Sequence, residues 1–263
     1  MPGDGRGDTR GSIHRIRQEP CGLRRGARAT YGFLTQIPVL GRFLQRAWSR
    51  YRNLAQPFQG SRDYWEKRYR SGSTSGAGSY GEHATFKAEF LNKFVVKHEI
   101  RTVLEWGCGD GNQLSLAEYD TYIGVDVSPT ALAICRQMFA GDLSKTFFLD
   151  EGNDSAQLLA TLNADLALSL DVIYHLVEDH VFELYMARLF DSARRYVVIF
   201  STNEDRTTVP HVRHRHFQTW ITRNRPDWKL AGVHRSPRGC ELPCDSELVA
   251  DFYVYKLRAP LTG

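Results

Sequence analysis

Residues 102–130 read TVLEWGCGDGNQLSLAEYDTYIGVDVSPT, and the pattern of this stretch decides the fold of the chain. A short apolar run is closed by Glu105, and a turn with glycine at every second position follows, at residues 107, 109 and 111. A second apolar run ends at Asp126. The predicted order is a strand, a tight turn, a helix, a second strand and an acid, which is typical of a nucleoside site at the carboxyl edge of a parallel sheet.

The chemistry of this turn narrows the class of ligand. Glycine lets the backbone turn sharply and approach a ligand where a Cβ would collide, and a helix that follows presents unpaired N–H groups. An acid at the end of the second strand can accept hydrogen bonds from both hydroxyls of a ribose. The G-x-G-x-G spacing differs from the dinucleotide pattern G-x-G-x-x-G, and Glu105 would repel a pyrophosphate. The stretch therefore predicts a nucleoside ligand that carries a positive charge.

The segments EWGCGDG and GVDVS resemble the first two motifs of the class I S-adenosylmethionine-dependent methyltransferases. The alternative is a glycine turn in another doubly wound protein, but turn, acid and spacing agree here. The resemblance spans roughly residues 62–258 and implies S-adenosylmethionine as the cofactor. It also implies an α/β fold, a Rossmann-like, doubly wound, seven-stranded and mostly parallel sheet with a C-terminal antiparallel hairpin.

Other elements follow from apolar patterns and from helix start signals. Ser128 and Pro129 predict the N-cap and the first residue of a helix. The remaining expected elements are a helix over residues 86–95, strands over 146–149, 165–171 and 194–202, an amphipathic helix after the fourth strand, and a closing hairpin from 228–236 and 248–258.

The cofactor site is expected to combine the glycine turn, the strand ends and an aromatic N-terminal segment. The resemblance assigns a lid role to this segment, because aromatic faces attract a sulfonium; the alternative is a surface helix whose aromatic side chains lie in the core. An acid after the third strand is expected to meet the adenine amino group, although neighbouring acids compete for this role. The expected cofactor-binding residues are Glu105, Gly107, Cys108, Gly109, Gly111, Asp126, Val127, Asp150, Ser169, Trp65, Tyr69 and Tyr80.

The candidate catalytic residues are Asp171, His175 and His214. Asp171 and His175 follow the fourth strand, where the sheet edge places them beside the transferable methyl group. His175 is the first choice as general base for a hydroxyl acceptor, and Asp171 could orient it or act alone. His214 belongs to HVRHRHF (residues 211–217), which could bind an anionic substrate group, supply the base or be a solvated loop. His175 could also be a packing residue, and no metal site is expected.

Charge is distributed unevenly along the chain, and the chain is predicted to have three parts. Residues 1–60 carry eleven Arg, no Lys and three acids, whereas the whole chain has a net charge of +4, so the remainder is mildly acidic. Residues 1–30 are predicted to be a disordered Arg/Gly-rich leader and 31–60 a basic amphipathic helical extension, followed by the methyltransferase domain at 61–263. Residues 31–56 could contact an anionic membrane or pack on the protein itself. The acidic body argues against a nucleic-acid partner.

These observations lead to a ranked set of functions. The first is O-methylation of a saccharide or glycan-linked acceptor, in polysaccharide biosynthesis, because residues 63–94 resemble bacterial methyltransferases associated with that process. The alternatives are O- or N-methylation of a small natural product or metabolite, RNA methylation that uses the basic N-terminal arm, and a non-enzymatic cofactor-binding scaffold. Five scattered cysteines and no long apolar run predict a cytoplasmic protein, with a membrane-peripheral location as the alternative. The oligomeric state is left open.

Overall fold

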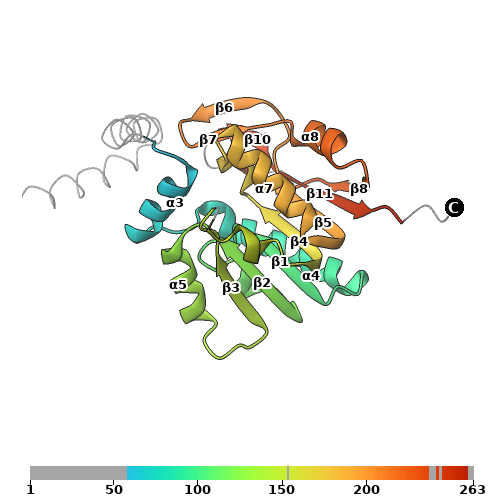
Figure 1. Ribbon diagram of the computed structural model, residues 1–263. Coiled ribbons are helices and arrows are strands. Elements are labelled where there is room, and N and C mark those ends of the chain that lie inside the picture. The colour runs from blue at the N-terminus through green and yellow to red at the C-terminus, as the bar shows by residue number, and fades with distance from the viewer. Residues whose placement is uncertain (1–57, 153, 237–240, 243–244, 260–263) are drawn as a thin grey trace, which may run out of the picture. The chain divides into compact units, whose positions relative to one another are not determined.

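The computed structural model describes residues 58–152, 154–236, 241–242 and 245–259 (Figure 1). The predictions for residues 1–30 and 31–56 lie outside the described residues. Within the described part of the chain a seven-stranded sheet has the order β3-β2-β1-β4-β5-β11-β8. Its strands are β1 (Thr102–Trp106), β2 (Thr121–Asp126), β3 (Lys145–Leu149), β4 (Ala164–Leu170), β5 (Ala193–Ser201), β8 (Trp228–His234) and β11 (Asp251–Leu257).

The first five strands are parallel, and β11 lies antiparallel between β5 and β8. The strand order reverses between β1 and β4, which is the switch point where doubly wound sheets bind ligands. The predicted Rossmann-like sheet and its closing hairpin are therefore confirmed. Two further antiparallel pairs join β6 (Arg206–Val209) to β7 (Val212–His214) and β9 (Glu241–Leu242) to β10 (Asp245–Val249).

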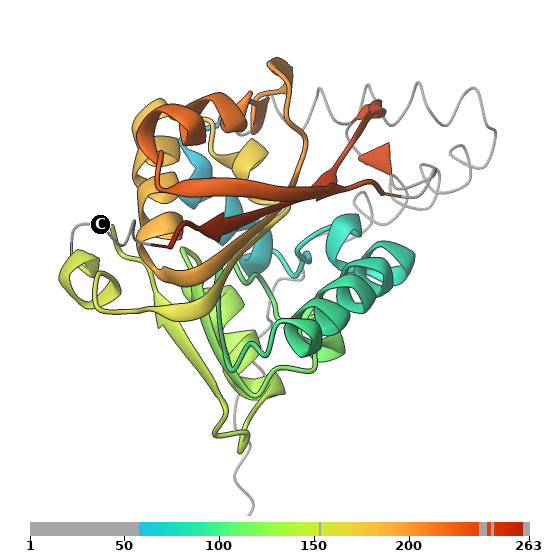
Figure 2. The same cartoon turned by 90° about the vertical axis from the view of Figure 1, so that its right-hand side faces the viewer.

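Helices cover both faces of the sheet, as Figure 2 shows. Side chains alternate between the faces. Val103 and Leu166 pack with Leu91 on one side, whereas Leu104 and Ala167 pack with Phe182 and Phe217 on the other. The α-helices are α3 (Ser61–Arg70), α4 (Gly81–Lys97), α5 (Pro129–Met138), α6 (Ala156–Leu159), α7 (Asp179–Asp191) and α8 (Phe217–Asn224), and the 3₁₀ turns are η1 (Ala77–Ser79), η2 (Leu114–Leu116) and η3 (Ile173–His175).

The helix predicted between the first two strands is not formed. All of residues 107–120 are described, and they contain only the single 3₁₀ turn η2. The segment is too short for a helix that spans the sheet, and α4 covers this face instead. Asn92 on α4 fastens the short connection, because its side chain donates to Leu116 O at 3.0 Å and accepts from Glu118 N at 3.0 Å.

The start of α5 agrees with its sequence signals. Ser128 is the N-cap, and its Oγ accepts a hydrogen bond from Ala131 N at 3.0 Å. Pro129 occupies the first helical position, where its missing N–H costs nothing. Because Ser128 comes two residues after Asp126, the cap fixes the start of α5 beside the end of β2, at the edge where the ligand site is expected.

Candidate active site

A cavity of about 600 Å3 opens at the carboxyl edge of β1, β2 and β4. Its walls combine the glycine turn, the strand ends, α3 and one side of α7 from His180 to Arg188. Most of the residues predicted from the sequence line it: Trp65, Tyr69, Glu105, Gly107, Cys108, Gly109, Asp126, Val127, Asp150, Asp171 and His175. Four others, Tyr80, Gly111, Ser169 and His214, do not.

The glycine turn approaches the cavity at two of its three glycines. Gly107 and Gly109 have φ angles of 81° and 61°, which side chains rarely adopt. Gly111 also has a positive φ, 81°, but a Cβ there would lie 3.1 Å from Cys135 Sγ. Gly111 therefore allows close packing against α5, and it does not line the cavity.

Replacing Gly107 with alanine is expected to destabilise the protein by about 2–4 kcal/mol. A Cβ at this position would lie 2.5 Å from Cγ2 of Val172, and the left-handed backbone would be strained as well. Adding Val172→Ala should recover the steric part of the loss and leave the backbone part. The free energy of unfolding in urea, measured for both single variants and the double variant, checks this; an equal cost with and without Val172 would contradict the steric argument.

Asp126 is held at the end of β2 by backbone donors. Its Oδ2 accepts from Gly109 N at 2.9 Å and its Oδ1 accepts from Ser128 N at 2.8 Å. Burial raises the pKa of this carboxyl to about 6, although these hydrogen bonds oppose the rise. The carboxylate links the glycine turn to the end of β2 and retains lone pairs for the hydroxyls of a ribose.

Glu105 is the most deeply placed acid in the cavity wall, with an exposed fraction of 4%. The Tyr122 hydroxyl donates to its Oε2 at 2.7 Å. Burial raises the pKa of Glu105 to about 7, so that the carboxyl is partly protonated near neutral pH. A positively charged ligand would favour its ionised form and would bind more tightly as this carboxyl loses its proton.

Asp150 follows β3 and lines the cavity. It is engaged by two arginines that were not predicted from the sequence. Arg188 Nη1 donates to Asp150 Oδ2 at 2.9 Å, and Arg188 Nη2 donates to Gly152 O at 3.2 Å. Arg62 lies 3.8 Å from the other carboxylate oxygen. An adenine amino group that contacts Asp150, as predicted, would therefore bind a carboxylate that Arg188 already engages. Arg188 also lines the cavity and lies 6.0 Å from the centre of the Trp106 ring.

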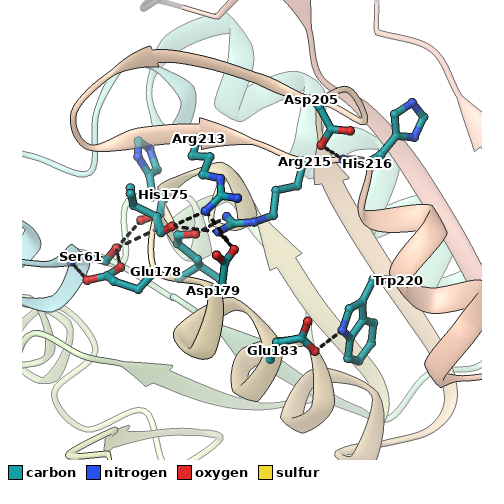
Figure 3. Close-up of polar contacts among 12 residues, drawn as sticks. Ser61, His175, Glu178, Asp179, Glu183, Asp205, Arg213, Arg215, His216 and Trp220 are labelled. Carbon is teal, nitrogen blue, oxygen red and sulfur yellow. Dashed lines mark hydrogen bonds and ion pairs between the residues drawn. The ribbon is translucent and has the colours of Figure 1, made fainter.

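The helix α3 is fastened on two sides of the cavity. At its start, Ser61 Oγ lies 2.6 Å from Glu178 Oε2 and 2.7 Å from His175 O (Figure 3). Further along, Glu66 Oε2 accepts from the Ser128 hydroxyl at 2.6 Å, beside α5. The helix thus bridges the segment after β4 and the segment after β2.

Two aromatic residues of this region, Trp65 and Tyr69, line the cavity, whereas Tyr80 supports the glycine turn from outside it. Trp65 meets the His175 ring edge-on, with 4.8 Å between ring centres. The Tyr69 hydroxyl lies 2.9 Å from Ser75 Oγ, above Gly109, where an added Cβ would be 3.1 Å from that hydroxyl. Tyr80 donates to Asp110 at 2.9 Å and stays outside the cavity, so it supports the turn without facing a ligand.

His175 is placed by η3, directly after β4. Its Nδ1 lies 3.2 Å from His211 O, and its ring borders the cavity beside Trp65. Although part of the residue is exposed to the cavity, the surrounding protein removes most of the water, and this desolvation lowers the pKa of His175 to about 4. The ring is therefore neutral at physiological pH.

Asp171 does not orient His175 through any hydrogen bond found among the described residues. Its Oδ2 lies 2.5 Å from Lys87 Nζ, and its Oδ1 accepts from the Tyr174 hydroxyl at 2.8 Å. Lys87 is fully buried, and Asp171 adopts a left-handed φ of 59°. Sequence reasoning missed Lys87, although a lysine between Ala84 and Leu91 on the apolar face of a helix is an unusual placement.

Two other predicted residues lie behind the cavity wall. Ser169 is buried and accepts a hydrogen bond from the Tyr185 hydroxyl at 2.7 Å, so that Tyr185 stands between it and the cavity. His214 lies on β7, buried, with its Nδ1 2.7 Å from Thr202 Oγ1. Its alternating position on the strand turns it into the core, where its ring centre lies 5.3 Å from that of Tyr174, the residue that donates to Asp171. His214 itself does not line the cavity.

The arginines of the histidine-rich segment are engaged by the protein itself. Arg213 and Arg215 each lie 2.9 Å from Asp179 Oδ1, and both donate to Val177 O (Figure 3). Neither lines the cavity. The predicted anion-binding use of this segment therefore has no support in the structure, because these guanidinium groups fix the start of α7.

The comparisons with known proteins agree with this geometry. Residues 104–197 match the model of a family described as a methyltransferase domain. The fold is shared with the N-methyltransferase NodS from Bradyrhizobium japonicum WM9 in complex with S-adenosyl-l-homocysteine, at 13% identity and a TM-score of 0.59 over 76% of this chain and 100% of that chain. It is also shared with magnesium protoporphyrin IX methyltransferase (ChlM) from Synechocystis PCC 6803 with bound SAM, at 15% identity and a TM-score of 0.54 over 78% and 100%. No curated protein matches the chain.

The residues around the cavity fit S-adenosylmethionine as the cofactor. Asp126 stands where a ribose would be held, and Glu105 offers a buried negative charge to a cationic ligand. Among the described residues there is no group of side chains arranged to hold a metal ion, and no helix long and apolar enough to cross a membrane. Fold, site and family match converge on one assignment. Residues 104–197 form a methyltransferase domain, and S-adenosylmethionine is the cofactor that its site fits.

Proposed function

We propose that the protein methylates a hydroxyl oxygen of a saccharide or glycan-linked acceptor, with His175 as the general base. The observation that carries the proposal is the 3.2 Å contact between His175 Nδ1 and His211 O. A carbonyl oxygen only accepts, so in the neutral ring Nδ1 carries the proton and Nε2 keeps a lone pair. The saccharide class is supported by the resemblance of residues 63–94 to bacterial methyltransferases of polysaccharide assembly.

The chemistry of the reaction explains why a proton acceptor is needed. The bound cofactor supplies an electrophilic methyl group on a sulfonium. The acceptor oxygen must lie in line with the carbon–sulfur bond, and its proton must leave as the new bond forms. The proposal is supported by the position of His175, which borders the same cavity as Gly107 and Asp126. An anionic acceptor is disfavoured because Arg213 and Arg215 are engaged elsewhere.

Replacing His175 with asparagine is expected to lower kcat by about 10²–10⁴-fold with neutral glycoside acceptors. The affinity for S-adenosylhomocysteine should stay within about threefold, because the proposed role concerns the acceptor proton and not cofactor binding. Production of S-adenosylhomocysteine with a panel of glycosides measures kcat, and calorimetry measures the affinity. His216→Asn, at an exposed histidine nearby, is the matched control. Full activity of the His175 variant would refute the role of general base.

A second candidate function is N-methylation of a small amine. It is favoured by the low pKa of His175, about 4, because such a weak base suits an acceptor that needs little help in losing a proton. In this case amines and not glycosides would be methylated, and His175→Asn would retain most of the activity.

A further inference from the structure

One face of α3 contacts both His175 and the residue that accepts its hydrogen bond. Ser61, Tyr64 and Trp65 stand three and four residues apart, so they share this face of the helix. Ser61 Oγ lies 2.7 Å from His175 O, and Trp65 packs edge-on against the His175 ring. The Tyr64 ring stacks on the His211 ring, with 4.2 Å between the ring centres and 15° between the planes. The first turn of α3 thus contacts both residues of the hydrogen bond between His175 Nδ1 and His211 O.

The stack holds the residue whose carbonyl faces His175. His211 follows Pro210 in the turn between β6 and β7, and its side chain is half-buried. The ring of Pro210 fixes the φ angle before His211, whereas the direction of His211 O depends on the conformation of His211 itself. A side chain that is packed against a neighbour restricts the conformations of its residue. The Tyr64 ring therefore restricts the direction of the carbonyl.

The direction of this carbonyl decides which nitrogen of His175 carries the proton. A neutral imidazole has one N–H, and an acceptor beside Nδ1 keeps the proton there and leaves the lone pair on Nε2. The rings of Trp65 and Tyr174 also contact His175, with 4.8 Å and 4.6 Å between ring centres, and limit its orientation. If the carbonyl of His211 turned away, the proton could move to Nε2, which then could not accept a second proton from a hydroxyl.

We propose that Tyr64 is a positioning residue for His175, because its stacking on His211 holds the carbonyl that keeps the proton of His175 on Nδ1. Tyr64 does not line the cavity, so it acts through His211 and not through contact with a ligand. The inference rests on the proposed role of His175 as the general base. Loss of the Tyr64 ring should therefore impair catalysis and leave cofactor binding intact.

The tautomer of His175 tests the inference without any acceptor. Ring 15N chemical shifts of the full-length protein with labelled histidine distinguish a protonated from an unprotonated nitrogen, and the signals of His175 are those lost in His175→Asn. The wild type and Tyr64→Phe, which keeps the ring, are expected to carry the proton on Nδ1. In Tyr64→Leu the equilibrium should shift toward the Nε2–H tautomer by about twofold to tenfold, the factor that a typical aromatic pair supplies.

His211→Ala tests the same stack from its other side, because it removes the second ring and retains the main-chain carbonyl. It should shift the tautomer as Tyr64→Leu does, and the two substitutions together should add little further shift. It also provides the test if Tyr64→Leu does not fold. Trp220→Leu is the matched control, because it removes a half-buried ring of α8 that packs edge-on against Phe182 at 6.2 Å. This control should leave the tautomer unchanged.

Turnover gives the second readout. With glycoside acceptors, kcat of Tyr64→Leu should fall about tenfold, whereas kcat of Tyr64→Phe should stay near the wild-type value. The affinity for S-adenosylhomocysteine, measured by calorimetry, should stay within about threefold in both variants.

Three results would overturn the inference. They are a wild type in which His175 carries its proton on Nε2, an unchanged tautomer in both Tyr64→Leu and His211→Ala, and an equal shift in Tyr64→Phe or Trp220→Leu, which would show that the stack is not the cause. A wild type that methylates no glycoside would instead refute the proposed function, while the expected tautomer shift would still support the role of Tyr64. The two failures are therefore distinguishable.

Discussion

Replacing Glu105 with glutamine is expected to stabilise the ligand-free protein above pH 7 and, at the same time, to weaken the binding of S-adenosylhomocysteine by about tenfold to a hundredfold. Burial raises the pKa of Glu105 from 4.5 to about 7. The folded state therefore binds more protons than the unfolded state between these values, so the free energy of unfolding falls as the pH rises through this window. The loss is complete above pH 7 and corresponds to about 3 kcal/mol.

Glutamine removes this cost because it stays neutral and can still accept the hydrogen bond from Tyr122. Thermal unfolding at pH 5 and pH 8 checks the first part: the two proteins should be similar at pH 5, and the variant should melt roughly 5 °C or more higher at pH 8. Calorimetry checks the second part. The affinity of the wild type should rise as the pH increases through 7, as Glu105 ionises, whereas the variant should show a flatter dependence. A variant that is destabilised at pH 8 would contradict the argument.

Replacing Lys87 with methionine is expected to lower the free energy of unfolding by about 3 kcal/mol or more. Lys87 is completely buried, and it is the ion-pair partner of Asp171, whose side chain is 12% exposed. Removing one partner leaves a poorly solvated charge, which costs more than the intact pair contributes. The Tyr174 hydroxyl remains as a donor to Asp171 but carries no charge.

The double variant Lys87→Met/Asp171→Asn separates this explanation from simple loss of packing. Asparagine adopts left-handed backbone angles more readily than most residues, so it suits the φ of 59° at this position. The double variant should be more stable than Lys87→Met alone, with a coupling energy of about 2 kcal/mol in urea unfolding experiments. Additive effects of the two single substitutions would show that the charge pair is not the cause.

The fold could be predicted from the sequence because its signals are local. The near-continuous apolar run of β4 is typical of a strand buried on both faces, and Ser128 with Pro129 sets the start of α5. The helix that was wrongly predicted between β1 and β2 could also have been excluded from the local sequence. Residues 112–120 are too few for a covering helix with its turns, so the length of this segment could have excluded the helix.

The site could be predicted only where its residues adjoin a motif. Glu105 and Asp126 end strands, and their positions in the chain place them at the cavity. Lys87 reaches Asp171 across 84 residues of sequence, and no spacing rule relates two residues so far apart. His214 shows the opposite case, because its motif suggested chemistry while its position on β7 turns it into the core.

The covering of the sheet by α4 sets a limit on how small an autonomously folding fragment can be. The family match spans residues 104–197, yet this span lacks both α4 and β11. A fragment with these bounds would leave one face of β1 and β4 in water and the edge of β5 without its partner. During synthesis on the ribosome, the nucleoside-binding half emerges well before residues 251–257, so the sheet cannot close until β11 has been translated. Its long-range pairing raises the contact order and slows folding.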